Sequence, residues 1–551
     1  MTAKNILFIM YDQLRFDYLS CAGHPHLHTP NFDRVAAMGL RFDRAYVQSP
    51  ICGSSRMSTY TGRYASSHGA EWNGFPLRVG EMTMGDHLRK AGMACWLVGK
   101  THMRADTEGM ERLGVDPDSI IGVRTAECGF DVWVREDGMV PVGPDGPYDD
   151  RPSPYNDYLT AQGYPGPNPW AHHANAGITE GQIASAWYLA NSDRQANIRE
   201  MDSETPWLTD RALEFIDHQT GPWCAHLSYI KPHWPYIAPA PYHTMYGPNH
   251  VPAPLRTQAE LDSSHPVFQQ FTQDAAGRAF HSDATRNKVI PAYMGLIKQC
   301  DDQLGRILDH LDKTGKVDDT VIVLTSDHGD YLGDHWMGEK GFMHDQSVRV
   351  PLIIYDPSPK ADATRGTVSQ HLVEAIDLAP TFIELAGGTP PENWLEGRSL
   401  VPLLHGDPVP HWRHYAISEY NYSPTPMRDA LALTDQDARL FMVATHRWKL
   451  IHFEGGFRPV LFDLKNDPDE LTDLGTDPEH GETISALMAM LNHWARRQAQ
   501  RVTRSATDLA CARNGSDGVG IVIGAFDAND ISDDLMAAYI GPARADYTND
   551  T

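Results

Sequence analysis

Short apolar runs alternate along the chain with longer segments in which apolar residues recur every three or four positions. Five runs rich in Ile, Val, Leu and aromatic residues predict buried strands, at residues 5–11, 93–99, 223–230, 320–326 and 351–355. Residues 287–313 place apolar side chains at spacings of three and four, which predicts one buried face of a long helix. Strands separated by helix-length segments are typical of an α/β fold, with a mostly parallel central sheet flanked by helices.

The pattern changes at about residue 408. Residues 439–464 alternate like antiparallel strands, and residues 482–498 predict a helix. We therefore expect a large α/β domain over residues 1–407 and a smaller C-terminal α+β domain, an antiparallel sheet plus a helix, over residues 408–505. Residues 506–551 are acidic and weakly patterned. They predict a tail at the subunit contacts of a homo-oligomer, a dimer or a tetramer.

One stretch inside the large domain departs from the alternation of strands and helices. At about residues 131–172, Pro, Gly and Asp are concentrated in an irregular insertion, too long for an ordinary turn. We expect a surface excursion, and we expect leaving-group specificity to lie in loops such as this one and residues 237–285.

Composition limits the partners of the chain. The 551 residues carry a formal net charge of −26, which excludes a long contact with nucleic acid or an anionic membrane. Seven scattered cysteines without a CxxC pair indicate neither a disulfide framework nor a zinc knuckle, and they suit a reducing compartment. No signal peptide or transmembrane segment is evident, so we expect a cytoplasmic protein.

Chemically active side chains directly follow four of the predicted strands: Asp12 and Gln13; Lys100 and His102; Lys231 and His233; Asp327 and His328. A single aspartate after a strand usually caps the next helix, but four coincident strand ends favour a shared site at one edge of the sheet. Asp12, Asp327 and His328 would give a divalent cation two carboxylates and one nitrogen, with Gln13 as a neutral oxygen ligand. The lysines and the other histidines would neutralise an oxyanion.

Cys52 opens the predicted helix at residues 53–63. Backbone amides and the helix dipole favour negative charge at a helix N-terminus, so a nucleophile there is activated and close to a bound anion. A lone cysteine is more often a small buried hydrophobic residue. The neighbouring Ser, Gly and Arg residues weaken that alternative, because they do not build an apolar core.

A second metal ion would need another cluster of acidic and histidine ligands. Asp334, His335 and His344 are candidates, but no acidic-histidine pair upstream completes them. A two-metal phosphatase is therefore the weaker interpretation.

Motifs spread over most of the chain resemble the sulfatase branch of the alkaline phosphatase superfamily and its relatives, the phosphonate monoester hydrolases. They are the first strand with Asp12 and Gln13, then "CGSSR", "TGRY", "GKTH", "KPHWPY", "SDHGDYLGDH", "GEKG" and "LFDLKNDPDE" in this order. The resemblance implies an alkaline-phosphatase-like fold and a hydrolase acting on sulfuric esters.

The resemblance also implies a modified nucleophile. In that family the motif cysteine is oxidised to formylglycine, whose hydrated aldehyde attacks sulfur; by resemblance this residue is Cys52, supported by Arg56. A formylglycine-generating machinery is then a partner. One divalent metal ion, manganese or calcium with zinc as a further candidate, would be held by the aligned ligand set: Asp12, Gln13, Cys52, Asp327 and His328.

Further roles are carried over by position. Lys100 and Lys340 would bind the sulfuryl oxygens, and His102 would assist breakdown of the covalent intermediate. His233, together with Lys340, would protonate the leaving oxygen. Asn73 would add a hydrogen-bond donor to the substrate.

Three positions separate this chain from the common sulfatase pattern. Ser54 replaces the proline of the usual modification signal, and Gln13 with His328 matches phosphonate monoester hydrolases, whereas Lys100 with His102 matches sulfatases. The leading hypothesis is arylsulfatase-type hydrolysis of sulfate monoesters, with promiscuous hydrolysis of phosphonate monoesters and phosphodiesters. The alternatives are primarily a phosphonate monoester hydrolase or phosphodiesterase, and an unmatured, non-catalytic binder of sulfated ligands.

Overall fold

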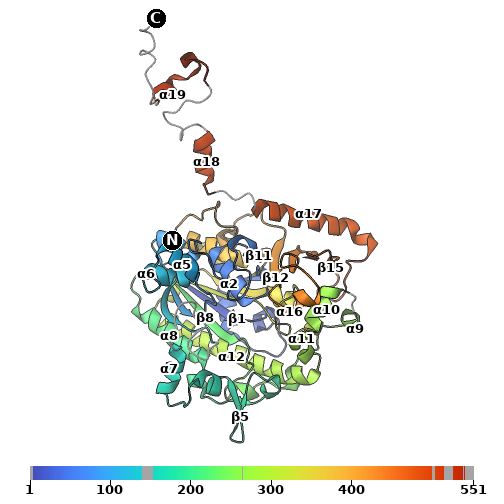
Figure 1. The fold of residues 1–551 in the computed structure, drawn as a ribbon. Coiled ribbons are helices and arrows are strands. Elements are labelled where there is room, and N and C mark those ends of the chain that lie inside the picture. The colour runs from blue at the N-terminus through green and yellow to red at the C-terminus, as the bar shows by residue number, and fades with distance from the viewer. Residues whose placement is uncertain are drawn as a thin grey trace. The chain divides into compact units, whose positions relative to one another are not determined.

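The computed structural model describes residues 4–138, 153–262, 265–498, 503–513, 525–537 and 539 (Figure 1). Contacts divide the chain into two compact units, one of residues 1–390 with 395–495 and one of residues 391–394 with 496–551. The expected site residues all belong to the first unit.

The first unit is built on an eight-stranded sheet in the order β11-β2-β10-β9-β1-β8-β3-β4. Its strands are β11 (Thr367–Glu374), β2 (Leu40–Tyr46), β10 (Arg349–Tyr355), β9 (Thr320–Ser326), β1 (Asn5–Asp12), β8 (Trp223–Pro232), β3 (Ala94–Gly99) and β4 (Asp131–Arg135). Only β10 runs antiparallel to its neighbours β9 and β2; the other neighbouring pairs are parallel. The five predicted strands are present, and the predicted fold class is confirmed.

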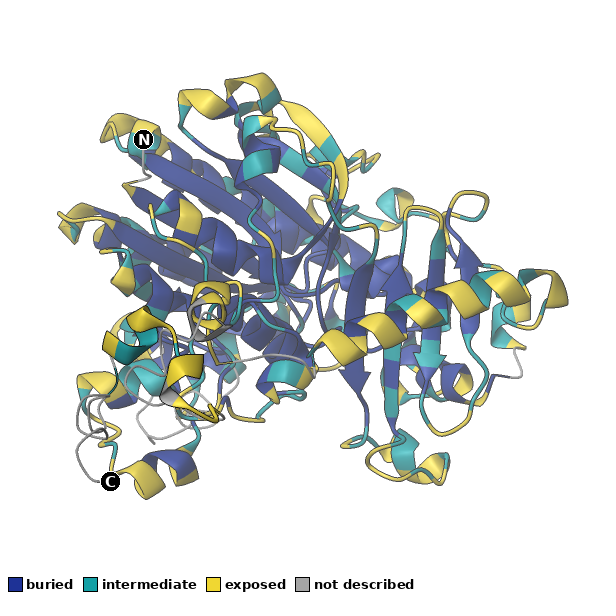
Figure 2. Ribbon diagram, turned by 90° about the horizontal axis from the view of Figure 1, so that it is seen from above, coloured by how far each residue is buried: buried dark blue, intermediate teal, exposed yellow. Residues whose placement is uncertain are grey.

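Helices cover both faces of this sheet, and β1 shows why. Leu7, Ile9 and Tyr11 belong to a core with α12 (Asp283–Lys313), α8 (Glu204–His218) and α1 (Pro30–Met38). Phe8 points to the other face, where its ring lies 5.3 Å from that of Phe382 in α14 (Leu378–Leu385). The central strand is thus apolar from Ile6 to Tyr11, because neither face meets water (Figure 2). The predicted long helix is α12, which begins four residues before the predicted start.

A second sheet lies toward the C-terminus of the first unit. Its antiparallel strands follow the chain order β12 (Ala416–Asn421), β13 (Arg439–Ala444), β14 (Trp448–Phe453) and β15 (Val460–Asp463). Helix α17 (Gly481–Gln498) buries Leu487, Leu491 and Trp494 against this sheet and keeps its outer face exposed (Figure 2). The expected antiparallel sheet plus helix is confirmed, whereas the boundaries at residues 407 and 505 stay predictions.

Parts of two predictions lie outside the described residues. The flanks of the expected insertion form β4 and α7 (Pro154–Ala161), but residues 139–152 are not described. Within the expected tail, the described helices are α18 (Ala506–Arg513) and α19 (Asp533–Ala537), and the role of the tail at subunit contacts stays a prediction. Over the described ranges, no helix is both long and apolar enough to cross a bilayer.

Candidate active site

The site lies at the carboxyl ends of the parallel strands. Asp12 is the last residue of β1, and Asp327 and His328 directly follow the neighbouring strand β9. Cys52 is the first residue of α2 (Cys52–Thr61), preceded by Ile51 in an extended conformation. Three of these four residues were therefore predicted from their positions at strand ends, and the fourth, Cys52, was predicted from its position at a helix N-terminus.

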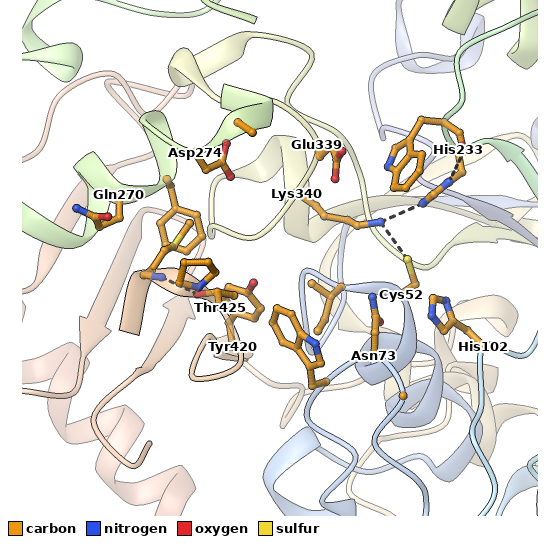
Figure 3. A pocket seen from close by; sticks show the side chains of 18 of the residues that line it. Cys52, Asn73, His102, His233, Gln270, Asp274, Glu339, Lys340, Tyr420 and Thr425 are labelled. Atoms are coloured by element: carbon orange, nitrogen blue, oxygen red, sulfur yellow. Dashed lines mark hydrogen bonds between the residues drawn. The ribbon is translucent and has the colours of Figure 1, made fainter. Parts of the chain in front are cut away.

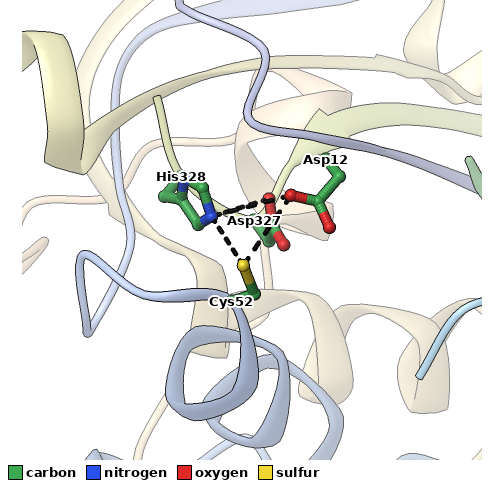
Figure 4. A group of neighbouring side chains, drawn as sticks. All are labelled: Asp12, Cys52, Asp327 and His328. Carbon is green, nitrogen blue, oxygen red and sulfur yellow. Dashed lines mark hydrogen bonds and ion pairs between the residues drawn. The ribbon is translucent and has the colours of Figure 1, made fainter. Parts of the chain in front are cut away.

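Asp12, Cys52, Asp327 and His328 form one buried group whose ligand atoms all lie within 4.8 Å of one another (Figure 4). Cys52 Sγ lies 3.0 Å from His328 Nε2, and His328 Nε2 lies 3.7 Å from the nearer carboxylate oxygen of each aspartate. His328 Nδ1 donates to the Gly329 carbonyl at 2.8 Å, which leaves Nε2 free as a ligand. Two carboxylates and an imidazole nitrogen are a donor set that fits a divalent metal ion.

Arg56 holds the two carboxylates in place. This fully buried guanidinium donates to Asp327 Oδ2 at 2.7 Å and to Asp12 Oδ2 at 3.1 Å. The Oδ1 atoms of both aspartates are thereby left facing the centre of the group. Burial and the Cys52 thiol raise the pKa of Asp12, but Lys100, His233 and Arg56 lower it more, so its pKa lies below the ordinary value.

Cys52 is buried in polar rather than apolar surroundings, in agreement with its predicted neighbours. Its exposed fraction is 1%, and Lys340 Nζ lies 3.0 Å from its Sγ. Burial alone raises the pKa of the thiol, but Lys340, His328 and Lys100 together hold it well below its ordinary value. The surroundings therefore stabilise negative charge on the side chain of residue 52.

Two ammonium groups flank this side chain. Lys100 Nζ donates to Asp12 Oδ2 at 2.6 Å, and Lys340 Nζ reaches His233 Nε2 at 3.2 Å (Figure 3). Burial, more than any charge, lowers the pKa of His233 to about 4, so its imidazole is neutral at physiological pH. Lys340 keeps its proton, because Cys52, Asp12 and Glu339 outweigh burial and raise its pKa. His102 lies on the other side of Cys52, lines the cavity and also lowers the pKa of its thiol.

Gln13 occupies the border of the metal-ligand group. Its backbone N–H donates to Asp327 Oδ1 at 3.1 Å, and its Oε1 accepts from Lys340 at 3.2 Å. Its Nε2 donates to Asp330 at 2.5 Å and lies 3.0 Å from the hydroxyl of Tyr236. Asp330 thus orients the amide so that the oxygen faces the site, a role that sequence reasoning missed although Asp330 stands in the "SDHGD" motif.

Asn73 contacts the N-terminus of α2, the helix that begins with Cys52. Its Oδ1 accepts the N–H of Gly53 at 2.7 Å, so its amide NH₂ group is left for the cavity. This arrangement agrees with the expected donor, whose contact with substrate stays a prediction.

The expectation that Lys231 joins the anion-binding group is wrong. Its Nζ donates to Asn175 at 3.2 Å and lies 3.7 Å from Glu204, and its side chain does not line the cavity above Cys52. Lys231 still belongs to β8, and the packing of that strand turns its ammonium away from the site.

The candidates for a second metal ion are also engaged elsewhere. Asp334 pairs with Arg15 at 2.7 Å, and His335 pairs with Glu260 at 2.6 Å. His344 stacks on the ring of His335. In the part of the chain that the structure describes, no second group of three or more such ligands converges.

A cavity of about 770 Å³ lies above Cys52. Lys100, His102, His233 and Lys340 line it near the thiol, and Trp72, Phe271, Asp274, Glu339 and Tyr420 line it as well (Figure 3). The members of this second set were not predicted individually, because they come from distant segments, but Phe271 and Asp274 lie within residues 237–285, a range expected to carry leaving-group specificity. Trp72 and Glu339 nonetheless directly precede the predicted site residues Asn73 and Lys340 in the chain.

The chain has well-matched relatives. The sequence profile of the family described as sulfatase matches residues 4–388, and the profile of the C-terminal region of N-sulphoglucosamine sulphohydrolase matches residues 333–497. The multifunctional alkaline phosphatase superfamily protein PehA of Trinickia caryophylli is 31% identical, over 91% of this chain and 97% of its own.

Two further relatives represent two chemistries. An arylsulfatase of Clostridium perfringens is 27% identical, over 88% of this chain and 93% of its own. The structure of the phosphonate monoester hydrolase SpPMH of Silicibacter pomeroyi superposes with a TM-score of 0.77 at 31% identity, covering 89% of this chain and 95% of that one.

Proposed function

Because the chain belongs to the sulfatase family and is a hydrolase acting on sulfuric esters, we propose that it hydrolyses sulfate monoesters of the arylsulfatase type. The observation that carries the proposal is the pair Lys100 and His102, set beside the group of Asp12, Cys52, Asp327 and His328. We further propose promiscuous hydrolysis of phosphonate monoesters and phosphodiesters.

One divalent metal ion would be held by Asp12, Asp327, His328 and the side chain of residue 52, with the Gln13 oxygen as a further ligand. When bound, it supplies Lewis-acid stabilisation of negative charge. Formylglycine, formed from Cys52 by a dedicated oxidising machinery, would supply a nucleophilic hydroxyl that a cysteine lacks. The low pKa of the Cys52 thiol supports this position for an anionic nucleophile.

Lys100 and Lys340 are placed to bind the sulfuryl oxygens. Both ammonium groups border the Cys52 side chain and both keep a raised pKa, so they stay charged as negative charge builds up on the reacting ester. Arg56 is a positioning residue, because it holds the two aspartates and does not line the cavity.

Two histidines would handle protons on opposite sides of the reacting atoms. His233 is neutral and accepts a hydrogen bond from Lys340, so this pair offers a proton to the leaving oxygen. His102 lines the cavity beside the side chain of residue 52 and is placed to take a proton from it. Asn73 would contribute its free NH₂ group to a substrate oxygen.

The second candidate function is a phosphonate monoester hydrolase or phosphodiesterase. It is favoured by Gln13 with His328 and by the similarity to SpPMH. We would compare kcat/KM for para-nitrophenyl sulfate and para-nitrophenyl phenylphosphonate on protein whose Cys52 conversion has been measured by peptide mass. A higher value for the sulfate supports the proposal, and a higher value for the phosphonate supports the second candidate. An intact thiol in the natural host would favour the third alternative, a non-catalytic binder of sulfated ligands.

A further inference from the structure

The cavity above Cys52 is much larger than a sulfuryl group needs. About 770 Å³ is the size of a pocket for a whole organic ligand. The part of the cavity away from Cys52 therefore surrounds the alcohol that leaves, and its side chains select that alcohol.

One side of this outer part is aromatic. The rings of Trp72 and Tyr420 stack at 5.6 Å with 23° between their planes, and the ring of Phe271 lies 6.1 Å from that of Tyr420. All three line the cavity, although they come from three distant segments of the chain. Aromatic faces bind flat apolar groups and attract cations.

Two carboxylates line the same outer part. In the view of Figure 3, Asp274 and Glu339 lie on one side of the cavity and Tyr420 lies on the other. Their negative charges raise the pKa of Tyr420, after burial, so both carboxylates act on the same space that the aromatic ring faces. Acidic groups and an aromatic face thus border one volume.

Burial raises the pKa of both carboxyl groups, that of Glu339 to about 7 against the opposing charge of Lys340, so a bound cation would favour their charged forms. Asp274 Oδ1 accepts the N–H of Gly277 at 2.6 Å as the cap of α11 (Ala275–Phe280), and none of the described residues donates a hydrogen bond to the Glu339 side chain. Over the described ranges, no lysine, arginine or histidine forms an ion pair with either residue. Lys340 follows Glu339 in the chain but directs its ammonium to Cys52, Gln13 and His233.

The cavity therefore has a positive end and a negative end. Lys100 and Lys340 attract the sulfuryl group at Cys52, and Asp274 with Glu339 attract positive charge at the outer part. A second anionic group on the alcohol would be repelled there.

We infer that the outer part of the cavity is a cation subsite, formed by Asp274, Glu339 and the aromatic rings of Tyr420 and Trp72, and that the preferred esters carry an amine or quaternary ammonium group on the leaving alcohol. This inference rests on the proposed function for the reacting end. The chemistry that recognises the cation is charge attraction together with cation–π contact.

The test compares two esters of equal shape: the sulfate ester of para-(trimethylammonioethyl)phenol and that of its uncharged carbon isostere, para-(dimethylbutyl)phenol. The ethyl spacer keeps the acidity of the two phenols similar. We expect kcat/KM to be about tenfold higher for the charged ester, and we expect Glu339→Gln to reduce this ratio about three- to tenfold. Asp274→Asn keeps the helix cap and removes the charge, so it should reduce the ratio as well.

A matched control removes a carboxylate elsewhere. Glu111→Gln on the exposed surface of α5 (Thr107–Leu113) changes the net charge equally and should leave the ratio as in the wild type. Equal kcat/KM for both esters in the wild type, or a ratio that Glu339→Gln and Asp274→Asn leave unchanged, would overturn the subsite and leave the proposed function standing.

If fully converted protein hydrolyses neither ester, that outcome contradicts the proposed function. A binding measurement then tests the cation subsite separately from the proposed function. Calorimetry would then compare the two free phenols. Tighter binding of the cationic phenol to the wild type than to Glu339→Gln supports the subsite, and equal binding of both phenols to the wild type overturns it.

Discussion

Lys340 Nζ lies 3.2 Å from His233 Nε2, although 107 residues separate the two in the chain. His233 Nδ1 donates to the Trp234 carbonyl at 2.6 Å, which leaves Nε2 to accept from Lys340. The pair therefore holds its transferable proton on Lys340 and directs it at the cavity.

His233→Ala should make the rate depend more strongly on the leaving alcohol. We expect kcat/KM to fall about 10²–10⁴-fold for the sulfate of an alkylphenol and less for para-nitrophenyl sulfate, which needs little protonation as it leaves. The measurement is a plot of log kcat/KM against the pKa of the phenol. A parallel drop for all esters would contradict proton delivery by this pair; the surface control His310→Ala should leave the plot as it is.

Cys52→Ala should reduce turnover of sulfate esters by about 10³-fold or more, because the nucleophile would be absent. Cys21→Ala serves as the matched control, since Cys21 is a free, partly exposed cysteine outside the site. Initial rates with para-nitrophenyl sulfate provide the measurement. Wild-type rates in Cys52→Ala would refute the proposed mechanism.

Arg56→Lys should weaken metal binding about 10–100-fold, because a lysine cannot bridge Asp12 and Asp327 as the guanidinium does. Competition with a chelator, followed by metal analysis, measures this loss without relying on activity. Arg34→Lys changes an ion pair with Asp309 near the surface and should bind metal like the wild type. Unchanged affinity in Arg56→Lys would mean that the carboxylates are held by other contacts.

Gly99→Ala should lower the free energy of unfolding by about 3–5 kcal/mol. Gly99 has a φ of 111°, and an added Cβ would lie 2.2 Å from the carbonyl oxygen of Ser228. Gly92→Ala measures the effect of a positive φ without a steric clash, because its φ is 83° but its Cβ would meet open space. This variant should lower the free energy of unfolding by about 1–2 kcal/mol. Urea titrations would compare the two variants, and equal losses would show that the close approach to β8 is unimportant.

Stability should fall in acid because buried histidines are held neutral. Burial and Arg63 lower the pKa of His68 to about 3, while Ser58 and the Ala70 N–H hydrogen-bond its two nitrogens. The unfolded chain takes up a proton near pH 6.5 and the folded chain does not, so the free energy of unfolding should fall by about 1.4 kcal/mol per pH unit from this histidine between those two pKa values.

Urea titrations at several pH values test this dependence. His68→Gln removes the titrating group, so the slope of stability against pH should decrease by the equivalent of one proton. An unchanged slope in His68→Gln would contradict the neutral, buried state of His68.

Local sequence patterns were sufficient for the centre of the sheet but not for all of its strands. The strands β1, β8 and β9 are buried on both faces, so they read as continuous apolar runs. Strand β2 has the sequence LRFDRAY with three charged side chains, and its pattern predicted no strand. It pairs with β10 and β11, and these long-range contacts outweigh its local composition.

The residues of the candidate site likewise divide into those that the sequence predicted and those that it did not. Asp12, Asp327 and His328 were predictable because parallel strands place their carboxyl ends at one edge, a property of topology that the order of motifs carries. Lys231 also stands near the end of a predicted strand in the sequence. Its side chain does not reach the site, however, because the packing of β8 turns its ammonium toward Glu204. The individual residues of the outer cavity wall were not predictable, since Trp72, Phe271, Glu339 and Tyr420 share no local pattern, and only the loop of residues 237–285 was expected to contribute.

The sequence by itself determined the α/β class, the strand-end residues and the family, because apolar periodicity and short motifs are properties of neighbouring residues. Only the tertiary structure decided which atoms meet: that Arg56 bridges two aspartates, that Asp330 orients Gln13, and that Asp274 and Glu339 border the same cavity as Tyr420. Distances between segments far apart in the chain depend on the packing of the whole core, and no local pattern encodes them.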